Sequence, residues 1–574
     1  MFSLHGSGLG GGIAIGRAHR LAPQLLDVAR YRIEQHRVEA ELVRIDRAIA
    51  ESRQALETIT EDLPESAPAE ARALIDIHLM LLEDELFVQG ARAIVADQGW
   101  NAEWAVASRA QELAEQFDEF EDLYMRERGR DVRQVAERLL KSLGGTSARV
   151  GGEGVETPVF VAEDISPADM LALRNAFGFV IDLGGTTSHA AILARSLQVP
   201  TVVGLGCARE LIRDDDWVIL DADAGLVIVA PDEEVLAQYR TLQAESLLAQ
   251  DKLKRLAKVP AVTVDGVAVE LLANIELPGE AEAAHELGAV GVGLFRSEFL
   301  FMNRSDLPDE DEQFEAYRDV IVAMRGKPVT IRTLDAGADK PIEAMKEWQS
   351  ANPALGLRAI RFSLAEPEIF LVQLRAMLRA GRFGKLRILL PMLAHGHEVD
   401  QSLRLIEQAR EQLRARRVLA AEHVEVGGMI EVPAAALSAD YFARRLDFLA
   451  IGTNDLAQYT LAIDRDDHAV AALYDPYHPA VLGLVARTIR AANKRRRPVS
   501  VCGEFAGEPD ATALLLGMGL RQFSMHPASL LRIKREVLHA DAAKLASRVA
   551  RLLRTDDPDR VRALLERLGD PERQ

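Results

Sequence analysis

One histidine in a segment rich in glycine and hydroxyl residues is the residue best placed to do chemistry. Residues 184–196 read GGTTSHAAILARS, where two glycines allow a tight turn and Thr187 or Ser188 can cap the helix that the alanines and leucine favour. His189 then falls in the first helical turn, where the helix dipole and free N–H groups disfavour imidazolium and accommodate phosphate. The pattern indicates a neutral imidazole nucleophile that becomes a phosphohistidine, although a lone histidine is more commonly an ordinary buried side chain.

A second set of polar residues ends apolar segments in the C-terminal half of the chain. Arg296 and Arg332 each end a candidate strand, and guanidinium groups match phosphate and carboxylate oxygens in bidentate geometry. Glu431 and Asp455 end two more candidate strands, and two carboxylates that leave room for water and substrate suit Mg²⁺. Such a metal would polarise a phosphate and a developing enolate. The alternative is that these residues form salt bridges in a core, which is common for one residue and uncommon for several at corresponding strand ends.

The two cysteines, Cys207 and Cys502, lie far apart in unlike contexts, so a disulfide framework is excluded and a reducing compartment fits. A lone cysteine on a strand is usually a small core residue. Cys502 ends the seventh candidate strand and precedes Gly503 and Glu504, which leaves catalytic and packing roles equally open.

Eight strand-then-helix units after residue 262 would position these side chains. The candidate strands are 269–275, 291–296, 329–335, 386–392, 426–432, 447–454, 499–504 and 522–525. Eight such units predict a C-terminal (β/α)₈ TIM barrel, a fold that places its chemistry at the C-terminal ends of the strands. The polar residues named above lie where that rule expects them, together with Asn454.

The first half of the chain predicts three further parts. Apolar side chains at helical spacing over 28–145 predict a helical bundle. Short apolar strands with glycine turns on both sides of it predict a compact α/β domain, and a charged, leucine-containing stretch after residue 231 predicts a linker helix. The predicted domains are 1–22 plus 146–231 (phosphohistidine α/β domain), 23–145 (inserted helical bundle), 232–261 (linker helix) and 262–574 (barrel).

Composition excludes several classes of protein. With 68 Lys and Arg against 88 Asp and Glu, the net charge of −20 argues against nucleic-acid or anionic-membrane partners. The N-terminus lacks a basic segment followed by an apolar core, and no run of about 18 apolar residues occurs. We therefore expect a cytoplasmic location and no membrane association.

One motif is set aside. Gly6, Gly8 and Gly11 match the spacing of a dinucleotide-binding loop, but no strand is expected in the five residues before them, so the required context fails.

Taken together, the motifs resemble the enzyme I family of the phosphoenolpyruvate-dependent sugar phosphotransferase system. GGTTSHAAILARSLQVPTVVG resembles its phosphohistidine segment, and HLMLLEDELF and LYMRERGRDVRQVAERLL resemble its helical domain. Its barrel motifs occur in order as GVGLFRSEFLFMNR, RTLDAGADK, NPALGLRAIR, FGKLRILLPM, IGTNDLAQYTLAIDR and CGEFAG. The resemblance covers essentially the whole chain.

The resemblance implies roles for individual residues. His189 would take the phosphoryl group of phosphoenolpyruvate, Cys502 would protonate the enolate to give pyruvate, and Mg²⁺ would bind Glu431 and Asp455. The residues that would hold phosphoenolpyruvate are Arg296, Arg332, Lys340, Arg358, Asn454 and Arg465. The helical domain would dock the phosphocarrier protein HPr, through His78, Met80, Asp84, Glu85 and Arg126. The family also implies a homodimer formed through the barrel.

Two positions depart from the family pattern. Thr186 stands where an arginine is usual, and we expect retained activity with altered phosphate contacts. Ala338 replaces the second glycine of the usual GGDK, which adds a methyl group and restricts the backbone beside the substrate loop.

Three alternatives compete with this interpretation. Pyruvate phosphate dikinases and phosphoenolpyruvate synthases share the histidine segment and barrel but need a large ATP-binding domain, for which the helical residues before 150 offer no glycine-rich loop. A passive phosphoprotein charged by another kinase would not need an intact set of barrel residues. A nitrogen-type regulatory relay usually has an extra N-terminal sensory domain, whereas this chain starts directly at the phosphotransferase region.

Overall fold

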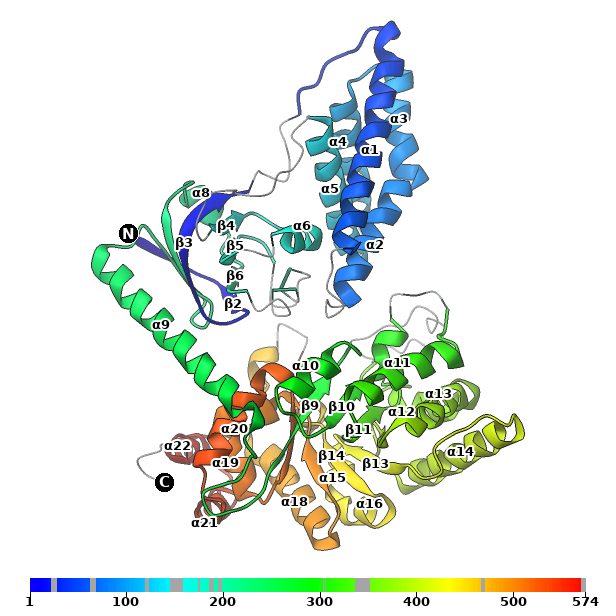
Figure 1. The fold of residues 1–574 in the computed structure, drawn as a ribbon, viewed down its shortest axis with the longest axis vertical. Helices are drawn as coiled ribbons and strands as arrows, with labels where there is room; N and C mark the ends of the chain where they lie inside the picture. Colours follow the sequence, from blue (N-terminus) through cyan, green and yellow to red (C-terminus); the bar gives the residue numbers. More distant parts are fainter. Residues whose placement is uncertain are drawn as a thin grey trace. The chain divides into compact units, whose positions relative to one another are not determined.

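The residues fall into two units, Met1–Gln250 and Asp251–Gln574, each with its own hydrophobic core (Figure 1). The structure is a computed structural model. It describes the chain except for residues 22–27, 62–68, 119–122, 145–157, 174–175, 185–189, 192, 195–198, 303, 305, 336–351, 466–469 and 569–574.

The first unit contains an eight-stranded mixed sheet in the order β1-β8-β7-β3-β4-β5-β6-β2. Strands β3 to β6 run parallel to one another, whereas β1, β2 and the β7–β8 pair are antiparallel to their neighbours. The strands are β1 (Phe2–His5), β2 (Ser7–Leu9), β3 (Ile13–Arg20), β4 (Pro158–Ala162), β5 (Gly178–Ile181), β6 (Thr201–Val203), β7 (Trp217–Asp221) and β8 (Leu226–Val229).

The expectation that no strand precedes Gly6 was wrong, because β1 lies there and pairs with β8. Short glycine-rich strands carry little side-chain pattern, and their pairing depends on close backbone approach: a Cβ at Gly8 would lie 1.8 Å from the carbonyl oxygen of Ala222. The segment still lacks the strand–loop–helix order of a dinucleotide site, since the next element is strand β2.

Between the adjacent parallel strands β3 and β4 the chain forms a bundle of long helices, as predicted (Figure 1). The helices are α1 (Val38–Glu61), α2 (Ala69–Glu83), α3 (Glu85–Gln98), α4 (Ala102–Asp118) and α5 (Leu123–Leu143). Their buried residues share one core with Phe160 and Phe179 of the sheet, and the short helix α6 (Pro167–Ala172) contacts α1 and α2. The bundle and sheet therefore support each other. The remaining described helices of this region are α8 (Ala208–Leu211) and α9 (Glu233–Arg255), followed by the 3₁₀ turn Leu256–Lys258.

The second unit is a closed, all-parallel barrel of strands β9 to β16 in chain order, which confirms the predicted (β/α)₈ fold. The strands are β9 (Glu270–Ile275), β10 (Val292–Arg296), β11 (Val329–Arg332), β12 (Leu386–Leu390), β13 (Glu425–Ile430), β14 (Phe448–Ile451), β15 (Val499–Val501) and β16 (Gln522–Met525). Strands β11 to β15 end two or three residues earlier than predicted.

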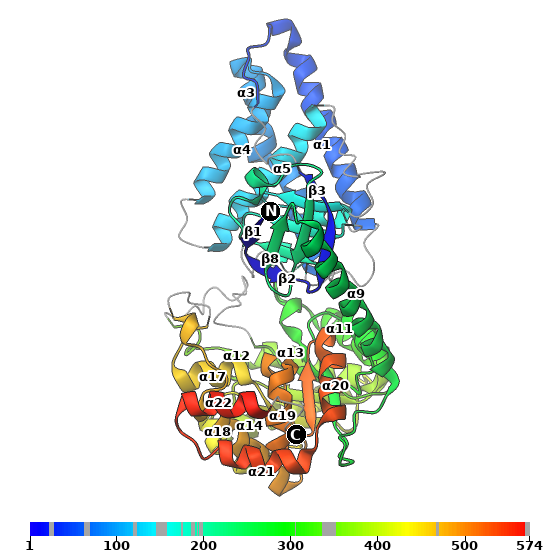
Figure 2. The same cartoon turned by 90° about the vertical axis from the view of Figure 1, so that its left-hand side faces the viewer.

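Helices surround this closed sheet (Figures 1 and 2). They are α10 (Glu280–Glu286), α11 (Glu310–Ala323), α12 (Ala359–Ala365), α13 (Pro367–Ala380), α14 (Gly396–Ala415), α15 (Pro433–Leu437), α16 (Ala439–Arg445), α17 (Thr453–Leu461), α18 (Pro479–Arg495), α19 (Pro509–Gly517), α20 (Leu530–His539), α21 (Ala542–Leu552) and α22 (Pro558–Leu568). One of the buried clusters in the barrel consists of Leu294, Leu389, Met429, Phe448, Ala450 and Cys502. None of the described helices is long and apolar enough to span a bilayer.

The barrel packing predicts the effect of removing one interior side chain. Leu389 is fully buried, so Leu389→Ala should lower the free energy of unfolding of the barrel by about 2–5 kcal/mol. The matched change Leu419→Ala, at a side chain that is 64% exposed, should stay within about 0.5 kcal/mol. Urea denaturation measures both, and equal midpoints for the two variants would show that Leu389 does not lie in a packed interior.

Candidate active site

The C-terminal ends of the barrel strands surround a polar cavity of about 410 Å³, here called the mouth. Every barrel residue that the sequence singled out and that the structure describes lines it: Arg296, Arg332, Arg358, Glu431, Asn454, Asp455, Arg465 and Cys502. Lys340 lies outside the described residues, as do Ala338, Thr186 and His189.

Several of these side chains reach the mouth because a strand ends beside them. Arg296 and Arg332 are the last residues of β10 and β11 and are paired across these strands. Glu431 directly follows β13, and Asp455 lies in the first turn of α17, just after β14. Parallel strands in a barrel end at one rim, so residues far apart in sequence converge there.

Two glycines permit the close approach of backbone at this rim. A Cβ at Gly452 would lie 2.7 Å from a carboxylate oxygen of Glu431. One at Gly503 would lie 1.9 Å from Oγ1 of Thr453 and 2.8 Å from Oδ1 of Asn454. Substituting either glycine would therefore displace residues of the mouth.

Three buried carboxylates, here called the acidic triad, meet in the mouth. Asp335, Glu431 and Asp455 each offer an oxygen within 4.8 Å of the others. Burial, reinforced by Asp455 and Asp335, raises the pKa of Glu431 to about 8, and burial also raises the pKa of Asp455. An all-oxygen donor set with excess negative charge fits a hard divalent cation, so the triad could hold a metal ion.

Arginines face the acidic triad. Nη1 of Arg332 lies 2.9 Å from Asp335, and Nη2 of Arg358 lies 2.9 Å from Asp335 and 3.4 Å from Asp455. Arg465 lies 3.8 Å from Asp455. Burial opposes the charge of Arg332 and Arg358, but the neighbouring carboxylates outweigh it and raise the pKa of both. The mouth therefore keeps strongly basic groups in a buried setting.

These ion pairs also bear on the alternative that the arginines are only internal salt bridges. Arg296 pairs with Glu276, and Arg332 also pairs with the buried Glu298 at 3.1 Å. Yet the buried Nε atoms of Arg332 and Arg358 have no hydrogen-bond partner among the residues that the structure describes. Unsatisfied donors of this kind are available to an anion.

The thiol of Cys502 is held as a proton-bearing group. It is only 2% exposed, and burial, followed by the negative charge of Glu431, raises its pKa to about 12. Its backbone carbonyl accepts a hydrogen bond from Nδ2 of Asn274 at 2.8 Å, and Asn274 accepts one from Ser524 at 2.6 Å. The thiol therefore stays protonated near neutral pH, which suits a proton donor better than a nucleophile.

Comparison with known proteins identifies the family. Three families match the chain: "PEP-utilising enzyme, N-terminal" over 5–128, "PEP-utilising enzyme, mobile domain" over 154–225 and "PEP-utilising enzyme, PEP-binding domain" over 250–542. The phosphoenolpyruvate-protein phosphotransferase of Cupriavidus necator is 54% identical over 99% of this chain and 100% of that relative. The chain belongs to the phosphoenolpyruvate-protein phosphotransferase family.

A second relative has the same name as the first. The phosphoenolpyruvate-protein phosphotransferase of Bacillus subtilis is 40% identical over 94% of each chain. A solution structure of Enzyme I shares 31% identity and covers 42% of this chain and 99% of its own, with a TM-score of 0.36. The matched families and the names of the Cupriavidus and Bacillus relatives show that the protein is an enzyme that uses phosphoenolpyruvate for phosphotransfer. Its polar barrel mouth is the candidate site.

Two acidic residues, one in the mouth and one beside it, were not predicted from the sequence. Asp335 lies in the motif RTLDAGADK, three residues after Arg332, and the rule that strand ends carry chemistry would have found it. Glu298 follows β10 and accepts from both Arg332 and the backbone N–H of Asp335. No sequence spacing relates Glu298 to its partners, because it meets them only across the barrel rim.

The residues expected to contact HPr differ in exposure. His78 is buried, with its Nε2 4.0 Å from Asp131, whereas Met80 is 63% exposed. Asp84 caps helix α3 by accepting a hydrogen bond from the backbone N–H of Phe87 at 2.9 Å. The side chains of Glu85 and Arg126 lie outside the described residues. His78 is therefore placed beneath this surface rather than on it.

The raised pKa of Glu431 predicts a pH dependence of stability. The folded protein keeps this proton up to a pKa of about 8, whereas the unfolded chain loses it near the ordinary value of 4.5. The stability of the metal-free protein should therefore decrease as the pH rises between these two values and then level off. Urea midpoints measured in a chelator across this range test the slope.

Glu431→Gln should flatten this slope, because the amide keeps an acceptor for the backbone N–H of Met392 but has no charge. Glu422→Gln, at an exposed glutamate nearby in the sequence, serves as the control and should leave the slope unchanged. A slope that persists in Glu431→Gln would assign the pH dependence to other groups.

Proposed function

We propose that this enzyme transfers the phosphoryl group of phosphoenolpyruvate to its own His189 and then to a histidine of the phosphocarrier protein HPr, with release of pyruvate. This would be the first step of a sugar phosphotransferase system. The observation that carries the proposal is the mouth, where basic groups, the acidic triad and the protonated thiol of Cys502 line one cavity. These are the groups that a trianionic substrate, a divalent metal and an enolate product each need.

Substrate binding is assigned to the basic residues of the mouth. Phosphoenolpyruvate carries a phosphate and a carboxylate, and both match guanidinium forks. The assigned residues are Arg296, Arg332, Arg358, Asn454 and Arg465, with Lys340. On binding, the substrate would replace some of the carboxylates that the arginines contact in the structure.

The metal is assigned as Mg²⁺, held by Glu431 and Asp455, and we add Asp335 to the ligands that the sequence indicated. When bound, Mg²⁺ would neutralise charge on the phosphate and on the developing enolate. The same three carboxylates repel one another without a cation, which supports their assignment as ligands.

In the chemical step, a ring nitrogen of neutral His189 attacks phosphorus in line and the bond to the enolate oxygen breaks. The Cys502 thiol gives its proton to the methylene carbon of the enolate, which yields pyruvate and a thiolate that water reprotonates. The raised pKa of Cys502 keeps that proton in place until the enolate forms. A buried thiolate beside Glu431 is disfavoured, so the thiol is restored for the next cycle.

Transfer to HPr is assigned to the helical bundle. Met80 and Leu86 are 63% and 68% exposed on α2 and α3 and offer apolar contacts for a small protein. From the resemblance we also propose Asp84, Glu85 and Arg126 as contacts on this surface, with the buried His78 supporting it from beneath. We also propose the domain division given above, a homodimer formed through the barrel and a cytoplasmic location.

The first test is intact mass spectrometry after incubation with phosphoenolpyruvate and Mg²⁺, beside a sample with ATP and Mg²⁺. We expect one acid-labile phosphoryl group from phosphoenolpyruvate alone, mapped to His189 and absent from His189→Ala. His19→Ala, at another histidine of the same unit, should keep the label. Labelling only from ATP would instead favour a dikinase, and no labelling from either donor would favour a passive phosphoprotein.

Cys502→Ala tests the proton donor separately from phosphotransfer. Pyruvate formation should fall about 100-fold or more, because general acid catalysis contributes that much. Transfer between preloaded His189 and HPr should continue at the wild-type rate, and Cys207→Ala should leave both steps unchanged. If Cys502→Ala loses the second step as well, or keeps normal pyruvate formation, Cys502 is not the acid.

A further inference from the structure

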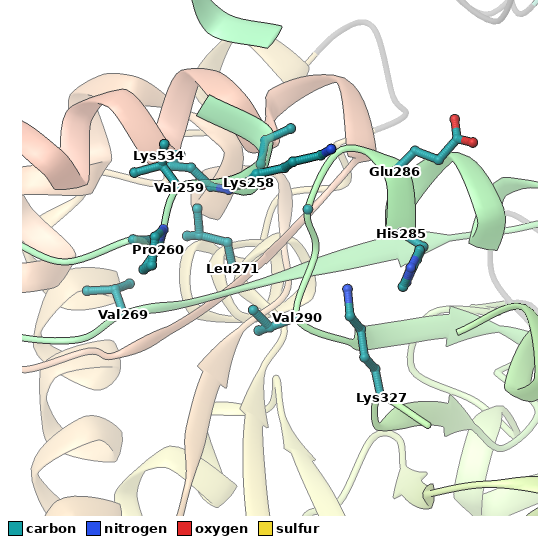
Figure 3. A pocket seen from close by; sticks show the side chains of 13 residues that line it. Lys258, Val259, Pro260, Val269, Leu271, His285, Glu286, Val290, Lys327 and Lys534 are labelled. Atoms are coloured by element: carbon teal, nitrogen blue, oxygen red, sulfur yellow. Dashed lines mark hydrogen bonds between the residues drawn. The ribbon is translucent and has the colours of Figure 1, made fainter. Parts of the chain in front are cut away.

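A second cavity, of about 670 Å³, lies where strands β9, β10 and β11 begin, at the end of the barrel opposite the mouth (Figure 3). We call it the basal cavity. Apolar residues form much of its wall, among them Val259, Pro260, Leu271 and Val290. Val259 and Val290 are about two-fifths exposed, so the cavity offers apolar surface to a small molecule.

Amines stand among these apolar residues. Lys534, on α20, is only 3% exposed, and its Nζ donates to the carbonyl oxygens of Leu256 at 3.1 Å and Ala257 at 2.9 Å. Lys327, just before β11, donates to the carbonyl oxygen of Ala289 at 2.5 Å. Lys258 lines the same cavity from the turn after α9.

The acceptors around Lys534 and Lys327 are neutral. In the part of the chain that the structure describes, neither ammonium has a carboxylate within salt-bridge distance. Burial lowers the pKa of both, and the charge of Lys327 lowers that of Lys534 further. A buried ammonium with only neutral partners is costly, and an anion in the cavity would remove that cost.

A histidine and a glycine complete the site. Nδ1 of His285 is buried and has no hydrogen-bond partner among the described residues. The charged groups near His285 are Lys327 and Arg325, against Glu282 and Glu286. In Figure 3 the Glu286 carboxylate points away from the side chains of His285 and Lys327. Gly288, with φ of +83°, brings its backbone beside Lys534, since a Cβ there would lie 3.1 Å from Nζ.

We propose that the basal cavity binds a small organic anion in which a phosphate or carboxylate group is joined to an apolar body. The anionic group would lie among Lys327, Lys534, Lys258 and His285, and the apolar body would lie against Val259, Leu271 and Val290. The site is separate from the mouth and does not depend on the reaction proposed there.

The competing explanation is structural. Lys534 ties the turn after α9 to α20, and the N-terminal end of a barrel commonly serves stability. That explanation accounts for Lys534 alone. Among the residues that the structure describes, it does not account for a second ammonium without a carboxylate in salt-bridge distance or for the buried Nδ1 of His285 without a hydrogen-bond partner. It also does not account for the open apolar wall beside them.

The test is calorimetric titration of the full-length protein with phenyl phosphate and with inorganic phosphate. One binding event should weaken about tenfold or more in Lys327→Met, as expected when a charged hydrogen bond is lost. Lys385→Met is the matched control, because Lys385 is exposed and precedes β12 much as Lys327 precedes β11, outside the cavity. Phenyl phosphate should bind more tightly than inorganic phosphate.

A resonance of the wild-type protein provides a second test, which does not depend on whether a variant folds. The imidazole resonance of His285 in the wild-type protein, assigned with His285→Gln, should shift when phenyl phosphate is added. The proposed site would be wrong if Lys327→Met bound phenyl phosphate as tightly as the wild-type protein, or if Lys385→Met lost as much affinity as Lys327→Met. It would also be wrong if the His285 resonance did not shift. Equal affinity for the two phosphates would overturn its apolar half.

Discussion

Like charges crowded into a buried space need cations beside them, and the mouth of this barrel is arranged around that need. Asp335 forms ion pairs with Arg332 and Arg358, each at 2.9 Å, while Asp455 faces Arg358 and Arg465. Without these guanidinium groups, burial and mutual repulsion would keep the carboxylates protonated, as the raised pKa of Glu431 illustrates. The acidic triad can then remain available to a cation while the arginines remain available to an anion.

The interior of the barrel sets how strongly these charges interact. Leu294, Leu389 and Met429 pack with Cys502 in one buried cluster, and exclusion of water there lowers the effective dielectric around the mouth. The same burial that strengthens the ion pairs holds the proton on Cys502. Packing and chemistry are thus linked, since loosening this cluster would weaken both the charge pairing and the retention of the proton.

The two ends of the barrel differ in the partners of their cationic side chains. At the mouth each buried arginine has carboxylate partners, whereas the described neighbours of Lys534 and Lys327 at the basal cavity are backbone carbonyls. Arginine stays charged in nearly any setting, but a lysine lowers its pKa when it is desolvated. The arginines of the mouth are therefore charged without a ligand. The charge of the lysines at the basal cavity depends on whether an anion binds there.

Much of the fold follows from patterns local to the chain. Eight repeats of an apolar strand and a helix were enough to predict the closed parallel barrel, and helical spacing was enough to predict the bundle. Strands β1 and β2 were missed because short glycine-rich edges are decided by their partners β8 and β6, which lie about 200 residues away. Most of the mouth could also be named in advance, because its residues follow strand ends.

What the sequence alone determined was therefore the kind of residue at each strand end and the order of the elements. The tertiary structure decided which of these residues share a space. It placed Asp335 with Glu431 and Asp455, put Glu298 against Arg332, buried His78 and gathered lysines at the base of the barrel. Periodicity is encoded by neighbours along the chain, whereas proximity and pKa depend on the closure of the barrel and on the water that this closure excludes.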